Sequence, residues 1–199
     1  MRRLLLLPCV LLLVAGLAEA KPRAPAVSPG VAADFVRRSC RSTSYPRVCE
    51  STLLPCAPAV GRSPRRLARA ALVVCADRAR NCSAYMRGGG NGAAASVGGA
   101  MKDCAELARD AEEQLRQSVA EMDRMGRAGS PRFAWSLSNV QTWASAALTD
   151  TSTCLDSLRH THDAKDKDAV RRRLVAVAQA TSNALALVNK LVDPAPHRL

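Results

Sequence analysis

Residues 130–158 read SPRFAWSLSNVQTWASAALTDTSTCLDSL, the most informative segment for the fold class. Ser130 followed by Pro131 is a helix start, because serine at the N-cap accepts a backbone N–H and proline suits the first helical position. Apolar residues then recur on one side of the predicted helix: Leu137, Val140, Ala144, Ala147, Cys154 and Leu158. The stretch therefore predicts a long amphipathic helix over about 131–160.

Three other segments, about 64–87, 100–125 and 166–192, repeat this pattern. The first opens with Ser63-Pro64 and ends at a glycine run, from which a Gly-Ala linker lasts to about Gly99. The second aligns Cys104, Ala108, Ala111, Leu115, Val119 and Met122. The last aligns Val170, Leu174, Val177, Thr181, Leu185, Val188 and Val192 before Asp193-Pro194 closes it. Four such helices with short connections predict an up-and-down antiparallel four-helix bundle.

The composition agrees with an all-α fold. Of the 199 residues 48% are hydrophobic and only 3% aromatic, so the core must be built from Ala, Leu and Val. Strands draw on aromatic and β-branched residues that are scarce here, whereas Ala and Leu favour helices.

The N-terminal part predicts export and a small helical extension. Residues 1–20 combine Arg2 and Arg3, an apolar run over 4–17 and Ala18-Glu19-Ala20, the pattern of a secretory signal peptide. That run is short for a membrane span, and later apolar segments are interrupted by charge, so we expect a secreted protein with no membrane segment in its mature form.

After cleavage, residues 21–30 carry three prolines and predict a flexible tail. Residues 31–58 predict two short helical pieces broken at Tyr45-Pro46, which Cys40 and Cys49 should clip into a hairpin. Hairpin and bundle form one domain over 31–193, followed by a C-terminal tail over 194–199.

Cleavage removes Cys9 and leaves seven cysteines, which in an oxidising compartment are disulfide candidates rather than metal ligands. Cys104 and Cys154 come level if their helices turn near residue 129, but Cys82 is equally level with Cys104 across the turn near residue 93. Cys75 and Cys82 lie about 10 Å apart along one helix, too far to pair with each other. Spacing therefore leaves two pairings open, and an odd number guarantees at least one cysteine without a partner in the chain.

Several stretches together resemble the plant invertase and pectin methylesterase inhibitors. The matching segments are FVRRSC at 35–40, TSYPRVC at 43–49, LARAAL at 67–72, SNVQTWASAALTD at 138–150 and TCL at 153–155. The likeness spans about residues 31–192. It implies a helical hairpin held by Cys40 with Cys49, on a bundle whose second and third helices are joined by Cys104 with Cys154. Cys56, Cys75 and Cys82 lie outside that framework.

The resemblance also implies a non-catalytic function. Members bind a cell-wall enzyme one to one and cover its substrate cleft, and the Asn-Val-Gln-Thr-Trp segment is more similar to the pectin methylesterase branch. Invertase inhibitors carry a Pro-Lys-Phe motif at the start of the third bundle helix, where this chain has Pro131-Arg132-Phe133. We therefore expect an inhibitor of pectin methylesterase, with acid invertase as the alternative target.

Two sets of residues are candidates for the interaction surface. Small polar residues recur on the side of the third bundle helix away from its apolar residues: Gln141, Thr142, Ser145 and Thr149. This ridge could approach a partner closely, or be an ordinary solvated face. Arg132 and Phe133 could form an interface hot spot, or Phe133 could pack at the helix start. Trp143 is expected to pack in the bundle rather than bind a partner.

The net charge, +12 for the chain and about +11 after cleavage, allows a second alternative, a non-inhibitory pectate-binding wall protein. Secretion argues against nucleic acid as a partner, whereas a basic inhibitor would associate electrostatically with pectin. Asn81-Cys82-Ser83 is an N-glycosylation sequon. The three histidines share no helix face and no nucleophile or paired-carboxylate motif stands out, so no metal, cofactor or enzyme activity is expected.

Overall fold

The computed structural model describes residues 28–89, 99–159 and 167–192, which are helical or in turns and include no strand. The signal peptide, the Gly-Ala linker and all three histidines lie outside the described residues. The chain begins with α1 (Pro29–Cys40), α2 (Pro46–Leu53), a 3-10 turn η1 (Leu54–Cys56) and α3 (Ala57–Val60). Four long helices follow: α4 (Pro64–Ala84), with a π-helical turn η2 (Tyr85–Gly89), then α6 (Gly99–Arg124), α7 (Pro131–Arg159) and α8 (Lys167–Asn189).

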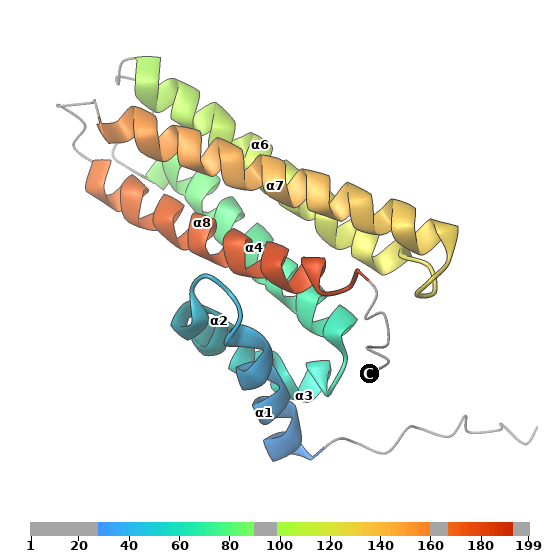
Figure 1. Cartoon of the computed structure of the whole chain (residues 1–199). Helices are drawn as coiled ribbons and strands as arrows, with labels where there is room; N and C mark the ends of the chain where they lie inside the picture. The colour runs from blue at the N-terminus through green and yellow to red at the C-terminus, as the bar shows by residue number, and fades with distance from the viewer. Residues whose placement is uncertain (1–27, 90–98, 160–166, 193–199) are drawn as a thin grey trace, which may run out of the picture.

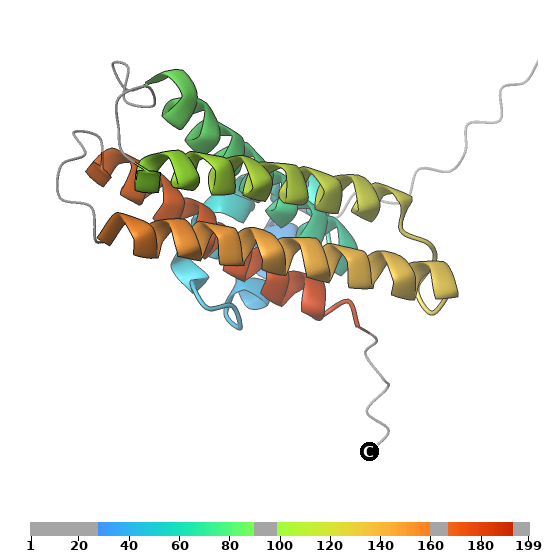
Figure 2. The ribbon, with the colours of Figure 1, turned by 90° about the horizontal axis from the view of Figure 1, so that it is seen from above.

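The four long helices form the predicted antiparallel bundle (Figure 1). α6 and α8 each pack against both α4 and α7, so α4 and α7 occupy diagonally opposite corners. Seen from above, α6 and α7 run side by side along one face, with the short N-terminal helices behind them (Figure 2). The short helices contact α4 and α8 and leave the α6–α7 side of the bundle uncovered.

Both predicted serine caps are confirmed. Ser63 Oγ accepts the backbone N–H of Arg66 at 3.3 Å, and Ser130 Oγ accepts that of Phe133 at 3.1 Å. Each cap satisfies an amide of the first turn that has no partner within the helix, so α4 and α7 begin where the Ser-Pro pairs predict.

The core consists of small and aliphatic side chains, as the composition predicts. The largest fully buried ones include Leu67, Leu72, Leu115, Leu158 and Leu174. Burying a leucine contributes roughly 1.5–3 kcal/mol, and the interleaved alanines let the helices approach closely.

The N-terminal extension differs from the sequence prediction at both ends. Pro29 and Gly30, expected in the flexible tail, are the first residues of α1, because proline is well tolerated in a first helical turn. The extension continues through η1 and α3 to Val60 rather than stopping at residue 58, and Gly61 ends it at a positive φ of 60°.

Two helix ends were predicted too far along the chain. α4 ends at Ala84 rather than at residue 87, and the π-helical turn η2 begins at the next residue, Tyr85. α8 ends at Asn189 rather than residue 192, so Val192 is 55% exposed instead of lying on the core face. Lys190 Nζ there donates to the carbonyl of Ser39, and the chain turns so that Leu191 is buried instead.

Two predicted core residues are only half-buried. Val119 and Leu185 lie at the margin of their helices, whereas Ser118 and Leu187 take the buried positions. Ser118 can be buried because its hydroxyl donates to the carbonyl of Gln114 at 2.9 Å. Each long helix meets two neighbours in the bundle, so its buried face is wider than a single stripe.

Candidate functional site

Two disulfides fix the framework that carries the candidate surfaces. Cys104 of α6 is bonded to Cys154 of α7 with their Cα atoms 4.7 Å apart, and Cys40 is bonded to Cys49 with a Cα separation of 5.5 Å. These are the pairings that the family resemblance implies, and Cys82, the alternative partner of Cys104, is free. α6 and α7 are therefore covalently joined near one end of the bundle.

Three cysteines of the described residues remain as thiols. Cys75 and Cys82 are buried, and burial raises the pKa of the Cys75 thiol to about 12 and that of Cys82 to about 11. Because the thiolate is the reactive form, both side chains are overwhelmingly protonated near neutral pH and react slowly. Cys56 is half-buried in the N-terminal extension.

The exposed side of α7 carries almost no charge. Between Arg132 and Asp156 the only charged residue of this helix is Asp150, which is half-buried, and burial raises the pKa of its carboxyl group. Exposed hydroxyl side chains recur there at spacings of three and four, forming what we call the hydroxyl face: Ser138, Thr142, Ser145, Thr149 and Ser152. Trp135, 64% exposed, continues this line one step toward the start of α7. Elsewhere exposed charged residues are common on the long helices, as at Arg66, Arg80 and Arg116.

Several of these hydroxyl groups are already satisfied within the helix. Thr142 Oγ1 donates to the carbonyl of Ser138 at 2.9 Å, Thr149 to that of Ser145 at 3.1 Å, and Ser152 to that of Leu148 at 2.8 Å. Covering such a group leaves no unpaired donor, so the face loses its water at a smaller cost than one of free hydroxyls or charges. It is thus suited to close contact with another protein.

Gln141, predicted as part of this ridge, and Trp143, predicted to pack in the bundle, both lie off the exposed face of α7. Gln141 is half-buried on the side next to α8, where its Nε2 donates to Asn189 Oδ1 at 2.9 Å. Trp143 is half-buried. The structure thus brings Thr142, Ser145 and Thr149 together on one exposed face and places Gln141 at the seam between two helices.

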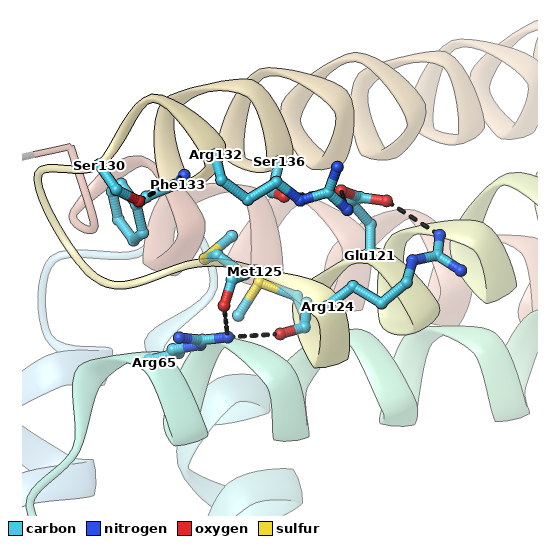
Figure 3. Close-up of polar contacts among 9 residues, drawn as sticks. Arg65, Glu121, Arg124, Met125, Ser130, Arg132, Phe133 and Ser136 are labelled. Atoms are coloured by element: carbon cyan, nitrogen blue, oxygen red, sulfur yellow. Dashed lines mark hydrogen bonds and ion pairs between the residues drawn. The ribbon is translucent and has the colours of Figure 1, made fainter.

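The turn between α6 and α7 is organised by a buried carboxylate. Glu121 accepts a hydrogen bond from Ser136 Oγ at 2.6 Å and one from Arg124 at 2.9 Å, and pairs with Arg132 at 3.3 Å (Figure 3). The bonds from Ser136 and Arg124 hold the pKa of Glu121 below its ordinary value. The first turns of α7 are therefore tied to the end of α6.

Arg65 supports the same turn from α4. Its guanidinium donates to the carbonyl groups of Met122 and Gly126, both at 3.0 Å, and to that of Met125. The Met122 carbonyl is in the last turn of α6 and the other two follow it, where carbonyl groups lack helical amide partners, and a cation at that place also complements the helix dipole.

Arg132 and Phe133 both make contacts within the fold. The Arg132 side chain is half exposed but pairs with Glu121, and Phe133 is half-buried with its ring against the core. This geometry supports the interpretation that Phe133 packs at the start of α7 rather than against a partner. Arg132 lies at the edge of the hydroxyl face.

Sequence reasoning missed three residues of this region. Trp135 fits the helical spacing of the hydroxyl face, so extending that pattern toward the start of α7 would have predicted its exposure. Glu121 interrupts an apolar stripe next to Met122, which is a sign of a buried ion pair. Nothing in the sequence signals Arg65, because its partners are backbone carbonyls about 60 residues away.

The remaining predicted features have simple placements. Asn81 of the glycosylation sequon is exposed on α4. Within the described ranges, no group of three or more potential ligands could hold a metal ion. None of the helices described combines the length and apolarity that crossing a bilayer requires.

Comparison with known proteins identifies relatives over most of the chain. Residues 34–187 match the family described as plant invertase/pectin methylesterase inhibitor. The chain is 38% identical over 175 residues to a 21 kDa protein of Daucus carota, covering 86% of this chain and 91% of that protein. It is 38% identical over 172 residues to pectinesterase inhibitor 11 of Arabidopsis thaliana, covering 84% and 85%. The crystal structure of a mutant pectin methylesterase inhibitor from Arabidopsis superposes with a TM-score of 0.51 at 17% identity, covering 75% of this chain and 92% of that one, and it shows the shared fold.

Proposed function

Because this chain belongs to the plant invertase/pectin methylesterase inhibitor family, and is thus an inhibitor rather than an enzyme, we propose that its target is pectin methylesterase. In this proposal the protein is secreted to the cell wall, binds the enzyme reversibly and one to one, and blocks the substrate cleft. Esterified pectin is then kept from the catalytic groups by steric exclusion, with no covalent step.

The observation that carries this choice is the target for which its relatives are named. Several curated relatives that are 35–38% identical over most of this chain are called pectinesterase inhibitors. The two disulfides support secretion, because such bonds persist in oxidising compartments.

The hydroxyl face of α7 is the surface we assign to the enzyme. It is exposed, nearly uncharged and uncovered by the N-terminal helices. The Cys104–Cys154 bond and the Glu121 cluster hold α7 on α6, so little conformational freedom is lost on binding. Charge depletion at the centre of a surface is typical of protein interfaces.

One observation favours acid invertase as a second candidate. Arg132 is half exposed at the start of α7, and the motif it shares with Pro131 and Phe133 differs from that of invertase inhibitors only by arginine in place of lysine. In that case the end of the bundle, rather than the length of α7, would enter the enzyme.

The deciding experiment is a side-by-side titration of the purified, oxidised protein without its signal peptide against pectin methylesterase and acid invertase. We expect loss of esterase activity at near-stoichiometric inhibitor. Loss of invertase activity alone would move the target to the second candidate. If neither enzyme responds and the protein binds pectate in a salt-sensitive way, the non-inhibitory wall protein is the better interpretation.

Two variants test the surface. Ser145→Arg places a long charged side chain at the centre of the hydroxyl face and should weaken esterase inhibition at least 30-fold, because the enzyme surface can no longer approach. Ser51→Arg, at an exposed serine of α2, is the matched control and should inhibit normally. Phe133→Ala, checked for an intact thermal transition, should leave esterase inhibition in place, whereas invertase inhibition would depend on Phe133.

A further inference from the structure

Trp135 is the most exposed large apolar side chain in the described part of the protein. Its side chain is 64% exposed, compared with 55% for Val192, 42% for Val31 and 40% for Tyr45. An indole that stays mostly in water contributes little of the stabilisation that burial of its large apolar area would provide to the fold. An exposed tryptophan of this kind is a candidate for contact with a partner.

The position of Trp135 distinguishes it from the other exposed apolar residues. Val31 and Tyr45 belong to the N-terminal extension, and Val192 follows α8. Trp135 lies on α7 three residues before Ser138, at the end of the hydroxyl face, and three residues after the half-exposed Arg132. Tryptophan and arginine are the residue types most enriched among interface hot spots.

The surroundings also hold this part of α7 in place. Ser136, the next residue, donates to the buried Glu121 of α6 at 2.6 Å, and Ser130 caps the helix start (Figure 3). The backbone that carries Trp135 is therefore ordered before any partner arrives, which lowers the entropy lost on binding.

We propose that Trp135 is the anchor residue of the inhibitor: its indole fills an apolar pocket beside the substrate cleft of the target enzyme while the hydroxyl face lies along the cleft. This assignment rests on the proposed function and names the residue that supplies most of the affinity. Arg132, held by Glu121, lies at the flank of the same contact.

The first test compares Trp135→Ala with Tyr45→Ala, which removes an exposed aromatic side chain from a different surface. Trp135→Ala should raise the inhibition constant for pectin methylesterase by about 30-fold or more, the range of a hot-spot truncation, and Tyr45→Ala should leave it within about threefold of the wild type. Both variants should keep the wild-type thermal transition, because neither side chain is in the core. A Trp135→Ala variant as potent as the wild type would overturn the anchor assignment while leaving the proposed function intact.

The second test observes the side chain directly. The chain contains only two tryptophans, so biosynthetic labelling with 5-fluorotryptophan gives two fluorine signals, and Trp143→Phe assigns them. On adding unlabelled enzyme, the Trp135 signal should shift and lose its sensitivity to solvent, and the half-buried Trp143 should change less. An unchanged Trp135 signal in a protein that inhibits the enzyme would refute the assignment. A wild-type protein that inhibits no pectin methylesterase would remove the proposed function and the anchor together.

Discussion

Removing the Cys104–Cys154 bond tests how the bundle is stabilised. This bond joins residues 50 apart in sequence, whereas the Cys40–Cys49 bond joins residues only 9 apart. From the loop-closure entropy of the unfolded chain, the longer loop contributes about 4 kcal/mol and the shorter about 2.5 kcal/mol. The double variant Cys104→Ala/Cys154→Ala should therefore lose about 1.5 kcal/mol more stability than Cys40→Ala/Cys49→Ala.

Urea unfolding followed by circular dichroism measures both variants against the oxidised wild type. With a slope of about 2 kcal/mol per molar urea, the bundle variant should lose about 2 M in its midpoint. All four cysteines are fully or almost fully buried, so the cavity left by each alanine is similar and largely cancels in the comparison. The reasoning would be refuted if the hairpin variant lost as much as the bundle variant, or if the bundle variant lost less than about 1 kcal/mol.

Three further predictions concern single side chains. Because its hydrogen bonds lower the pKa of Glu121, this group stabilises the fold above about pH 4.5 and loses that contribution as the pH falls through its folded pKa. Glu121→Gln should therefore make stability fall less steeply as the pH is lowered below about 4.5, and an unchanged profile in that acid range would contradict the role. Arg65→Ala should lower the free energy of unfolding by about 1.5–3 kcal/mol, because its cationic bonds to the carbonyl groups at the C-terminal end of α6 are lost. The substitution Arg66→Ala, at the neighbouring exposed arginine, should change it by less than about 0.5 kcal/mol. Protein secreted from a eukaryotic host should carry one N-glycan on the exposed Asn81, which a glycosidase removes and which is absent in Asn81→Gln. The Ser83 hydroxyl of this sequon is buried against Glu112 in the fold, so the glycan must be added before α4 packs on α6. A secreted wild-type protein with the unmodified mass would contradict this prediction.

Local signals in the sequence predicted the elements of this fold well. The Ser63-Pro64 and Ser130-Pro131 pairs marked two helix starts to the residue, because capping depends only on neighbouring groups. The helix ends were less predictable. α8 ends before Val192, at the point where Lys190 donates to the carbonyl of Ser39, about 150 residues away in the sequence. The residues around Val192 contain no signal that predicts so distant a contact.

The candidate surface was predicted only in part. Helical spacing identified Thr142, Ser145 and Thr149 as one face, and the structure shows them exposed together. The same spacing grouped Gln141 with them, but the side chain of Gln141 instead donates a hydrogen bond to Asn189 of the neighbouring α8. Which side of a polar stripe faces solvent depends on where the adjacent helix lies.

The all-α class, the four long helices, and the chemical character of their exposed and buried sides can be predicted from the order of the residues alone. These follow from the period of the apolar residues and from capping, which are properties of consecutive residues. The packing of the helices was needed to choose between Cys82 and Cys154 as the partner of Cys104, which residue spacing left open, and to show that Glu121 binds Ser136, Arg124 and Arg132 together. Each of these depends on how helices distant in sequence are rotated and placed against one another, and spacing along a single helix does not contain that information.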